Sequence, residues 1–411
     1  MVDQRGIDDQ RSLLDARTAA ARLGVDVRTL YAYAARGLVR SRPGPHGRRH
    51  LYDPDDIDRL LVRKRARAGH GAVAAAALRF GEPVLDSAIT ALGEGDIRYR
   101  GHALSRLVAD GVGFERVAEL LWSGALPARV QPWTALPLPW SRLRAVLQAP
   151  GAAIPRLAWV ASWIGLAHGA ALEDDAIAGA RALVATLAMA LAWPPVPSRG
   201  RGSTPTVAER CAWALGCAEH PRKRAAIELA LVVSADHELN ASAFGVRVAA
   251  STGADLAASV AAGLHVMSGP RHGAASRLLE QLLERAGAPS RVPALVRERL
   301  RLGERIPGFG HPIYPAGDPR VPPLLACARA MAPRSQRWLT LESLLRAMAE
   351  RGRDAPNLDA GLVAITIACG LPPGTATGLF ALGRTAGWIA HALEQRAAGF
   401  ILRPRARYVG P

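Results

Sequence analysis

From Ile97 nearly to the C-terminus, the chain repeats one pattern that restricts its fold more than any other feature. Apolar residues return at three- and four-residue intervals in stretches of about 10 to 20 residues, the spacing that buries one face of a helix. Gly and Pro interrupt these stretches, and no segment of any length alternates apolar and polar residues as a half-buried strand would. The pattern predicts an all-α body, and 411 residues are enough for two or three domains.

Four stretches break this helical rhythm and place a chemically active residue beside backbone breakers or other polar groups. They are Ala235–Asn240, Ser268–Gly273, Gly308–Pro312 and Asn357–Gly361. The third lies in RIPGFGHPIYPAGDPR, where glycines on the N-terminal side of His311 let the backbone approach a ligand closely. A single His in such a turn is more often structural than catalytic. Three of them and an isolated Asp indicate a functional site.

Two kinds of chemistry, metal binding and acid–base catalysis, could involve the same four residues, His237, His272, His311 and Asp359. A metal site is the weaker alternative, because the chain has no His-Glu-x-x-His pair and no Cys/His ligand spacing. A carboxylate can instead remove a proton next to a carbonyl, while imidazoles stabilise the enol oxygen and polarise a second carbonyl. The residues therefore favour acid–base chemistry on carbon without a metal.

Three arginines behind these stretches, Arg320, Arg384 and Arg403, suit a substrate with several carboxylates. A guanidinium can donate two parallel N–H bonds to one carboxylate, which gives both affinity and orientation. The sequence thus indicates a small polyacid as one substrate.

The first seventy residues form a separate unit. In ARTAAARLGVDVRTLYAYAARGLV, apolar residues recur at helical spacing on both sides of Gly24-Val25, and Asp26 is placed to cap a second helix. Two short helices joined by a tight turn predict a helix-turn-helix. VRSRPGPHGRRHLY then reads as two extended pieces around a Pro/Gly tip, and Asp53-Pro54 predicts the start of another helix.

This N-terminal segment resembles the winged helix-turn-helix of MerR-like regulators over residues 12–67, through TLYAYAARGLV, the wing and YDPDDIDRL. Five Arg and no acid lie between positions 36 and 49, a local excess of the kind that phosphate contacts need. The alternative is a helical appendage with a solvated Arg face. The predicted DNA contacts are Arg28, Arg40, Arg42, Arg48 and Arg49.

Composition excludes several classes of protein. The formal net charge is +17, but the only lysines are Lys64 and Lys223, so an Arg-rich and Ala-rich composition explains much of it. The four Cys have neither zinc-site spacing nor the density of a disulfide framework, which favours reduced core residues and a cytoplasmic location. The first ten residues are polar and carry three Asp, so a signal peptide is not expected. The longest runs without Asp, Glu, Lys or Arg fall short of about twenty apolar residues, so a membrane span is not expected either.

Separated motifs in the second part of the chain give it a resemblance to the citrate synthase family, from about residue 97 to the C-terminus. The resemblance implies a helical homodimer whose large and small domains close over oxaloacetate to form the acetyl-CoA site. It predicts a winged unit at 1–70, a linker or connecting helix at 71–96, large-domain segments at 97–271 and 365–411, and a small domain at 272–364. The motifs that carry it are ADHELNASAFGVRVAAST, GPRHGAAS, PGFGHPIYPAGDPR, NLDAGL, FALGRTAGWIAHALEQ, YRGHALSRL and LLWSGALP.

Transferred motif by motif, the resemblance implies a role for each active residue. Asp359 would remove a methyl proton from the acyl thioester, His272 would stabilise the enol, and His311 would polarise the carbonyl of the oxo acid. No metal or other cofactor is implied, and acetyl-CoA or propionyl-CoA would be a co-substrate. The substrate carboxylates would be bound by His237, Arg320, Arg384 and, from the other subunit, Arg403.

The CoA moiety would contact backbone at Ile306, Gly308 and Gly310. The chain departs from the family's pattern at Ser276, where Asn is common, and at Pro312 and Pro315, where basic residues are common. These departures predict an altered affinity for CoA, with Arg271 or Arg301 as a substitute for the missing charge. A DNA-binding regulator that uses the same body to sense a metabolite is the alternative function.

Overall fold

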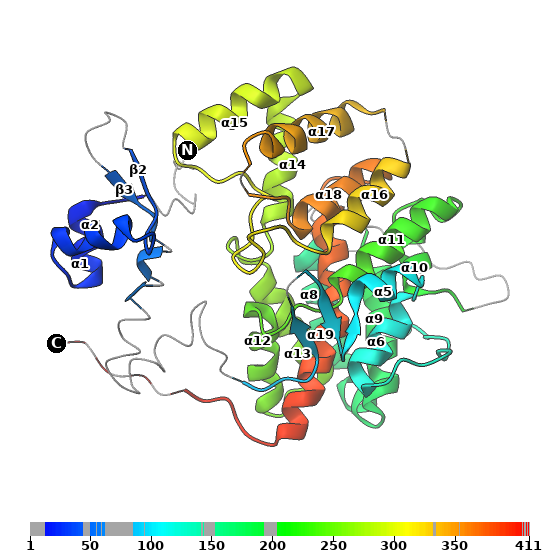
Figure 1. Cartoon of the computed structure of the whole chain (residues 1–411). Coiled ribbons are helices and arrows are strands. Elements are labelled where there is room, and N and C mark those ends of the chain that lie inside the picture. Colours follow the sequence, from blue (N-terminus) through cyan, green and yellow to red (C-terminus); the bar gives the residue numbers. More distant parts are fainter. Residues whose placement is uncertain are drawn as a thin grey trace, which may run out of the picture. The chain divides into compact units, whose positions relative to one another are not determined.

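The computed structural model describes most of the chain. The described residues are 13–43, 50–54, 56–58, 60–61, 85–93, 95–140, 143, 153–192, 204–331, 334–352, 354–404, 406, 408 and 410. They divide into two compact units, one containing the N-terminal part to position 86 with 299–304, and the other containing 87–298 and 305–411. Figure 1 shows the helices and strands of both.

The N-terminal unit has the predicted helix-turn-helix and wing. Helix α1 (Ala16–Leu23) ends at Gly24 in the left-handed conformation, and α2 (Val27–Ala35) begins at Asp26, whose carboxylate accepts a hydrogen bond from the Thr29 N–H. Strands β2 (Ser41–Pro43) and β3 (His50–Tyr52) pair antiparallel, and β1 (Leu14–Asp15) pairs with the other edge of β3. The helix expected after Asp53 is present at positions 54–61 wherever they are described.

This unit has a hydrophobic core of its own. Leu23, Leu30, Tyr52 and Ile57 are almost completely buried together with three smaller side chains. Arg40 pairs with Asp53 and Asp56, which fastens the start of the wing to the turn that follows it. The predicted tip of the wing, including Arg48 and Arg49, lies outside the described residues.

The second unit is a body of helices, as predicted. It contains α5 (Leu104–Ala109), α6 (Phe114–Ser123), α8 (Ala153–Glu173), α9 (Ala176–Met189), α10 (Val207–Ala214), α11 (Pro221–Ser234), α12 (Ala241–Ser251), α13 (Leu256–Met267), α14 (Ala275–Ala286), η1 (Pro289–Arg291), α15 (Val292–Arg301), α16 (Val321–Ala330), α17 (Gln336–Ala349), α18 (Leu358–Ala368) and α19 (Thr375–Ala398).

Helix α19 is the central element of this body (Figure 1) and packs against α6, α8, α9, α11, α12, α13, α14 and α18. Glycines allow its closest contacts: a Cβ at Gly383 would lie 2.8 Å from the Leu231 carbonyl oxygen, and one at Gly387 would lie 2.1 Å from Asp236 Oδ1. Both contacts bring the C-terminal end of α11 against α19. Among the described residues, no helix is long and apolar enough to cross a membrane.

The body also contains a small sheet that the helical pattern does not indicate. Strands β4 (Thr90–Leu92), β5 (Ile97–Tyr99) and β6 (His102–Ala103) pair antiparallel in that order. Each has two or three residues, too few for an alternating pattern to be visible in the sequence. Strand β4 lies within the segment predicted as a linker, and Thr90 donates a hydrogen bond to the buried Asp236 (Oγ1–Oδ2 2.6 Å).

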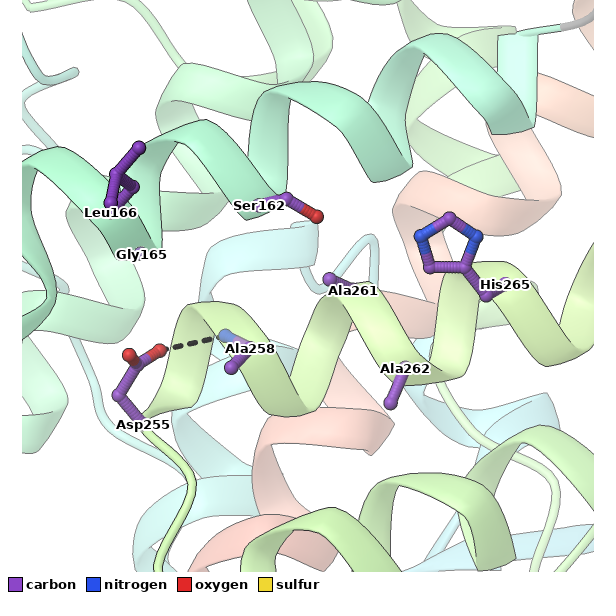
Figure 2. Close-up of a pocket in the computed structure, with 8 residues that line it drawn as sticks. All are labelled: Ser162, Gly165, Leu166, Asp255, Ala258, Ala261, Ala262 and His265. Atoms are coloured by element: carbon purple, nitrogen blue, oxygen red, sulfur yellow. Dashed lines mark hydrogen bonds between the residues drawn. The ribbon is translucent and has the colours of Figure 1, made fainter.

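A groove lies between α8 and α13, with a volume of about 470 Å³. Figure 2 shows Ser162, Gly165 and Leu166 from α8 facing Asp255, Ala258, Ala261, Ala262 and His265 from α13 and its N-cap. Small residues let the helices approach, since a Cβ at Gly169 would lie 2.9 Å from an oxygen of Asp255. Leu166 is 87% exposed, which makes it an apolar side chain open to solvent beside this groove.

Candidate active site

The loop between α15 and α16 brings His311 against His237, although 74 positions separate them in the sequence. Their ring centroids lie 5.4 Å apart, and Tyr314 contacts both rings. The Tyr314 hydroxyl is 2.8 Å from His237 Nε2. His237 follows the C-terminal end of α11, so this cluster joins the central loop to the helical core.

Arg320 and Asp318 form a buried pair directly after this loop. Two guanidinium nitrogens of Arg320 donate to the two carboxylate oxygens of Asp318, at 2.9 and 2.7 Å. Asp318 also accepts a hydrogen bond from the Leu358 N–H at 3.1 Å. Burial opposes the charged form of Arg320, but the bonds and the charge of Asp318 hold its pKa above the usual value. The pair thus fixes a permanent cation beside the start of α18.

Arg384 provides a second buried cation from the middle of α19. Its side chain is 1% exposed, its Nε donates to the Ser234 carbonyl at 2.8 Å, and its Nη2 has no hydrogen-bond partner among the described residues. Burial lowers the pKa of this guanidinium to about 10, so it is still charged at neutral pH. An unsatisfied buried N–H of a cation is costly, and an anionic ligand would supply the missing acceptor.

His272 lies in the turn before α14 and is held from the opposite side by α12. Its Nε2 is 2.8 Å from Ser242 Oγ, and the same oxygen accepts a hydrogen bond from the Trp388 indole at 3.1 Å. Ser242 Oγ in turn donates to Asn240 Oδ1 at 2.7 Å. This chain of polar contacts fixes the orientation of the imidazole.

Asp359 lies in the first turn of α18, whose N-cap is Asn357. Its Oδ1 accepts a hydrogen bond of 2.5 Å from Ser276 Oγ, in the first turn of α14. The predicted CoA-binding backbone is tied to the same turn, because the Asn357 N–H donates to the Gly308 carbonyl at 2.9 Å and the Gly310 N–H donates to Ala355 at 2.8 Å. Gly308 and Gly310 both have positive φ. Ile306, the other predicted contact, is buried in the same loop.

The electrostatic interactions place these groups in one neighbourhood. The charge of Arg320 acts on His237, His311 and Asp359, and that of Arg384 acts on His237 and His272. The structure therefore assembles six of the seven residues predicted for catalysis and oxo-acid binding around two buried guanidinium groups.

All three imidazoles are neutral at physiological pH. Burial, followed by the nearby arginines, lowers the pKa of His272 and of His311 to about 4, and lowers that of His237 well below its ordinary value. Burial raises the pKa of Asp359, and the hydrogen bond from Ser276 opposes this rise. Neutral imidazoles can donate a hydrogen bond to a developing enolate, and a carboxylate with a raised pKa is a stronger base.

Arg403 is the seventh predicted residue, and it is not part of this cluster. It follows α19 in a segment of the same chain without regular secondary structure, where it is exposed. Arg271 and Arg301, the predicted substitutes for CoA-binding charge, are also exposed, as are Pro312 and Pro315. In the N-terminal unit, Arg28 lies exposed on α2 and Arg42 on β2, whereas Arg40 is committed to its ion pairs with Asp53 and Asp56.

Sequence reasoning missed the residues that hold the active groups in place. Tyr314 and Asp318 stand within three and seven positions of His311, so their place in the same Gly/Pro-rich loop was a usable signal. Ser242 and Trp388 offered no comparable signal, because each lies within an ordinary helical pattern. Within the described part of the chain, no group of three or more His, Cys, Asp or Glu side chains is arranged as a metal site.

Comparison with known proteins agrees with both parts of the sequence. Residues 13–65 match the family described as a helix-turn-helix domain, and residues 79–405 match the citrate synthase C-terminal domain. The chain is 36% identical over 329 residues to "Putative citrate synthase 2" of Mycobacterium tuberculosis, covering 77% of this chain and 87% of that protein. It is 30% identical over 342 residues to the 2-methylcitrate synthase of the same organism, covering 76% and 84%.

Solved structures show the same fold. Citrate synthase from Thermotoga maritima superposes with a TM-score of 0.67 at 28% identity, covering 80% of this chain and 94% of that one. The enzyme from Thermoplasma acidophilum, solved with carboxymethyl coenzyme A and oxaloacetate, gives the same TM-score and coverage at 24% identity. With most of its length matched in sequence and in fold, the chain belongs to the citrate synthase family and carries a helix-turn-helix domain at its N-terminus.

Proposed function

We propose that this enzyme condenses an acyl-CoA, with acetyl-CoA as the first candidate, with oxaloacetate to give citrate, or 2-methylcitrate from propionyl-CoA, and free CoA. The observation that carries the proposal is the cluster of three neutral imidazoles and one carboxylate around the buried Arg320 and Arg384. The reaction requires no metal or other cofactor, since acid–base groups of the chain perform each step.

The first step forms the carbon nucleophile. Asp359 removes a proton from the methyl or methylene group next to the thioester carbonyl, and His272 donates a hydrogen bond to the enol oxygen that develops. For this task the Ser242 hydroxyl donates to His272 Nε2 at 2.8 Å instead of to Asn240, so that the neutral ring carries its proton on Nδ1 and can donate it to the enol oxygen. Because the ring is neutral, it stabilises the enol by donating a hydrogen bond and keeps its own proton.

The second step joins the two substrates. The enol carbon attacks the 2-oxo carbon of oxaloacetate while the neutral His311 polarises the carbonyl through a hydrogen bond, and the alkoxide oxygen that forms takes up one proton. Water then hydrolyses the thioester of the condensed product, breaking the C–S bond and releasing CoA as a thiol. The proton that Asp359 took from carbon balances the one gained by the alkoxide, so its transfer within the site returns Asp359 to the carboxylate form for the next turnover.

The carboxylates of oxaloacetate suit the two buried arginines. The Nη2 of Arg384, which has no hydrogen-bond partner in the described part of the chain, supports an ionic hydrogen bond to one carboxylate, and Arg320 and His237 lie in the same cluster. Since Arg403 is exposed in the single chain, we assign it to the site of a second subunit. The CoA portion is assigned to the backbone at Ile306, Gly308 and Gly310, with less ionic attraction at the exposed Pro312 and Pro315.

A homodimer accounts for the groove between α8 and α13 (Figure 2). Five of its eight lining residues are Ser, Gly or Ala, and Leu166 and Val266 are 87% and 39% exposed on the same pair of helices. Apolar side chains exposed beside a groove of this kind favour burial against another helical surface. A symmetric partner would cover this face and bring its own Arg403 toward the site.

Thiol release tests the enzymatic proposal. Purified protein is mixed with oxaloacetate and either acetyl-CoA or propionyl-CoA, and free CoA is followed with a thiol reagent. Release with at least one thioester is expected, and the ratio of the two kcat/KM values gives the acyl preference. Asp359→Ala should lower kcat by about 10²–10⁴-fold while oxaloacetate binding, measured by calorimetry, is retained. Absence of thiol release with both thioesters would contradict the proposal.

A second function, DNA binding by residues 12–67, is favoured by the exposed Arg28 and Tyr31 on α2 and by the match to a helix-turn-helix domain. In this motif the second helix enters the major groove. Full-length protein should retard duplex DNA in a gel-shift assay with a steep salt dependence, and removal of the first seventy residues should abolish this binding. Arg28→Ala should weaken it, whereas Arg17→Ala on α1 is the matched control. Salt-sensitive binding that survives the truncation would rule out this role.

A further inference from the structure

Ser276 occupies a position that makes it part of the acid–base apparatus. Its side chain is completely buried, and its Oγ donates to Asp359 Oδ1 at 2.5 Å. The two residues lie in the first turns of α14 and α18, two helices that pack against each other. Its departure from the Asn common in the family was expected to affect CoA affinity. The hydrogen bond between Ser276 and Asp359 indicates an effect on the catalytic base instead.

The hydrogen bond differentiates the two oxygens of the carboxylate. Oδ1 is held by Ser276, and Asp359 as a residue is not fully buried, which leaves part of it accessible. A carboxylate fixed at one oxygen cannot rotate freely, and its second oxygen keeps a constant direction. Proton transfer from carbon depends strongly on such alignment, because the reacting atoms must lie close together and in line.

The charged groups that act on Asp359 are Arg320 and Asp318, and their effects oppose each other. Burial raises the pKa of Asp359, while the Ser276 hydroxyl and Arg320 lower it. A hydroxyl that donates to an ionised carboxylate stabilises that form specifically. The serine therefore favours the ionised form of the base, against the effect of burial.

We propose that Ser276 is a positioning residue for the base: by donating to Oδ1, it holds the Asp359 carboxylate ionised and presents Oδ2 to the carbon-bound proton. The inference rests on the proposed function, in which Asp359 takes that proton.

The test is the pH dependence of kcat/KM in the full-length protein. Ser276→Ala should move the acid limb to higher pH by about 1 to 2 pH units, since hydrogen bonds to charged groups contribute in that range. The KM for oxaloacetate should stay within about twofold of the wild type, because the oxo acid is held by the arginines. Ser276→Asn, which restores an N–H donor, should return the limb toward its original position.

Ser259→Ala is the matched control. Ser259 is equally buried, but it lies on α13 and bonds only the Ala254 carbonyl. If Ser276→Ala scales kcat without moving the acid limb, as a purely structural defect would, the positioning role is wrong. A control that moves the limb as far as Ser276→Ala would also overturn it.

A second readout separates this inference from the proposed function. The carbonyl stretch of protonated Asp359, identified in infrared difference spectra by its loss in Asp359→Asn, reports the titration without turnover. Its midpoint should rise in Ser276→Ala and recover in Ser276→Asn. An unchanged midpoint contradicts the positioning role even in an active enzyme. Absence of thiol release in the wild type, with a midpoint that does shift, contradicts the proposed reaction alone.

Discussion

At the scale of single residues, the surroundings of Gly308 predict two separate costs of adding a side chain there, one from backbone strain and one from overpacking. Its φ is +82°, and a Cβ there would lie 2.7 Å from Leu279 Cδ2 and 3.3 Å from Ala360 Cβ. Gly308→Ala should therefore cost about 1 kcal/mol for the left-handed conformation and a further 1–3 kcal/mol for overpacking. It should also lower kcat, because Ala360 adjoins the base. Urea unfolding and thiol release measure the two effects.

Gly370→Ala provides the comparison for this substitution. Gly370 also has positive φ, at +67°, but no atom lies within 4 Å of its hypothetical Cβ. It should lose only the strain contribution, about 1 kcal/mol, and keep its activity. Equal losses of stability in the two variants would show that the contacts of Gly308 with Leu279 and Ala360 are unimportant.

The functional role of a residue could be predicted where its sequence neighbours form a motif. It could not be predicted where the role depends only on contacts in three dimensions. His272, His311 and Asp359 stand beside Gly, Pro or polar neighbours that no packing argument explains. The roles of Ser242 and Trp388 depend on where α12 and α19 cross, a three-dimensional fact that helical spacing does not encode. Ser276 was noticed as a departure, but its partner 83 positions away was not predictable.

At the scale of elements, α6 and α10 have N-termini stabilised by buried acids, and these acids predict a pH-dependent stability. The Phe114 N–H on α6 donates to Glu228, and the Val207 N–H on α10 donates to Glu115 at 2.6 Å. Burial, together with the neighbouring Glu115, raises the pKa of Glu228 to about 7. The folded state thus holds a proton that the unfolded state loses near pH 4.3, so stability is lost as pH rises through about 7.

Glu228→Gln keeps an oxygen that can accept from Phe114 and removes the charge. The variant should gain on the order of 2 kcal/mol over the wild type at pH 8 and little at pH 4, a rise in Tm of several degrees. Thermal unfolding at the two pH values measures the difference. Glu284→Gln, an exposed position on α14, is the control and should change Tm little at either pH. A Glu228→Gln variant that is less stable at pH 8 would refute the linkage.

At the scale of elements, the periodicity of apolar residues predicted the helices but not the shortest strands. It predicted the helical body because helices such as α14 bury one apolar face, with Leu279, Leu282 and Leu283 inside. It could not indicate strands β4, β5 and β6, which are held by pairing across the chain rather than by their own two or three residues. The predicted wing strands were visible because a Pro/Gly tip separates them.

At the scale of the whole molecule, the exposed Arg403 predicts that two subunits share each site. Asp359→Ala and Arg403→Ala should each be inactive or nearly so. When the two variants are mixed after dissociation or co-expressed, half of randomly formed dimers are mixed, and each mixed dimer has one intact site. Thiol release should therefore recover to roughly a quarter of the wild-type value. Recovery absent despite demonstrated exchange of subunits would place Arg403 outside the shared site.

Three backbone and side-chain bonds fasten the His311 loop to the residues that begin α18: Gly310 to Ala355, Asn357 to Gly308, and Asn357 Nδ2 to the Gly310 carbonyl at 3.0 Å. His311, which activates the carbonyl, and Asp359, which accepts the proton, are thus held on one connected segment of backbone. Any movement of this loop would therefore carry His311 and Asp359 together. We expect Asp359 to be unable to remove its proton while no oxo acid is bound, which protects the thioester from hydrolysis before condensation.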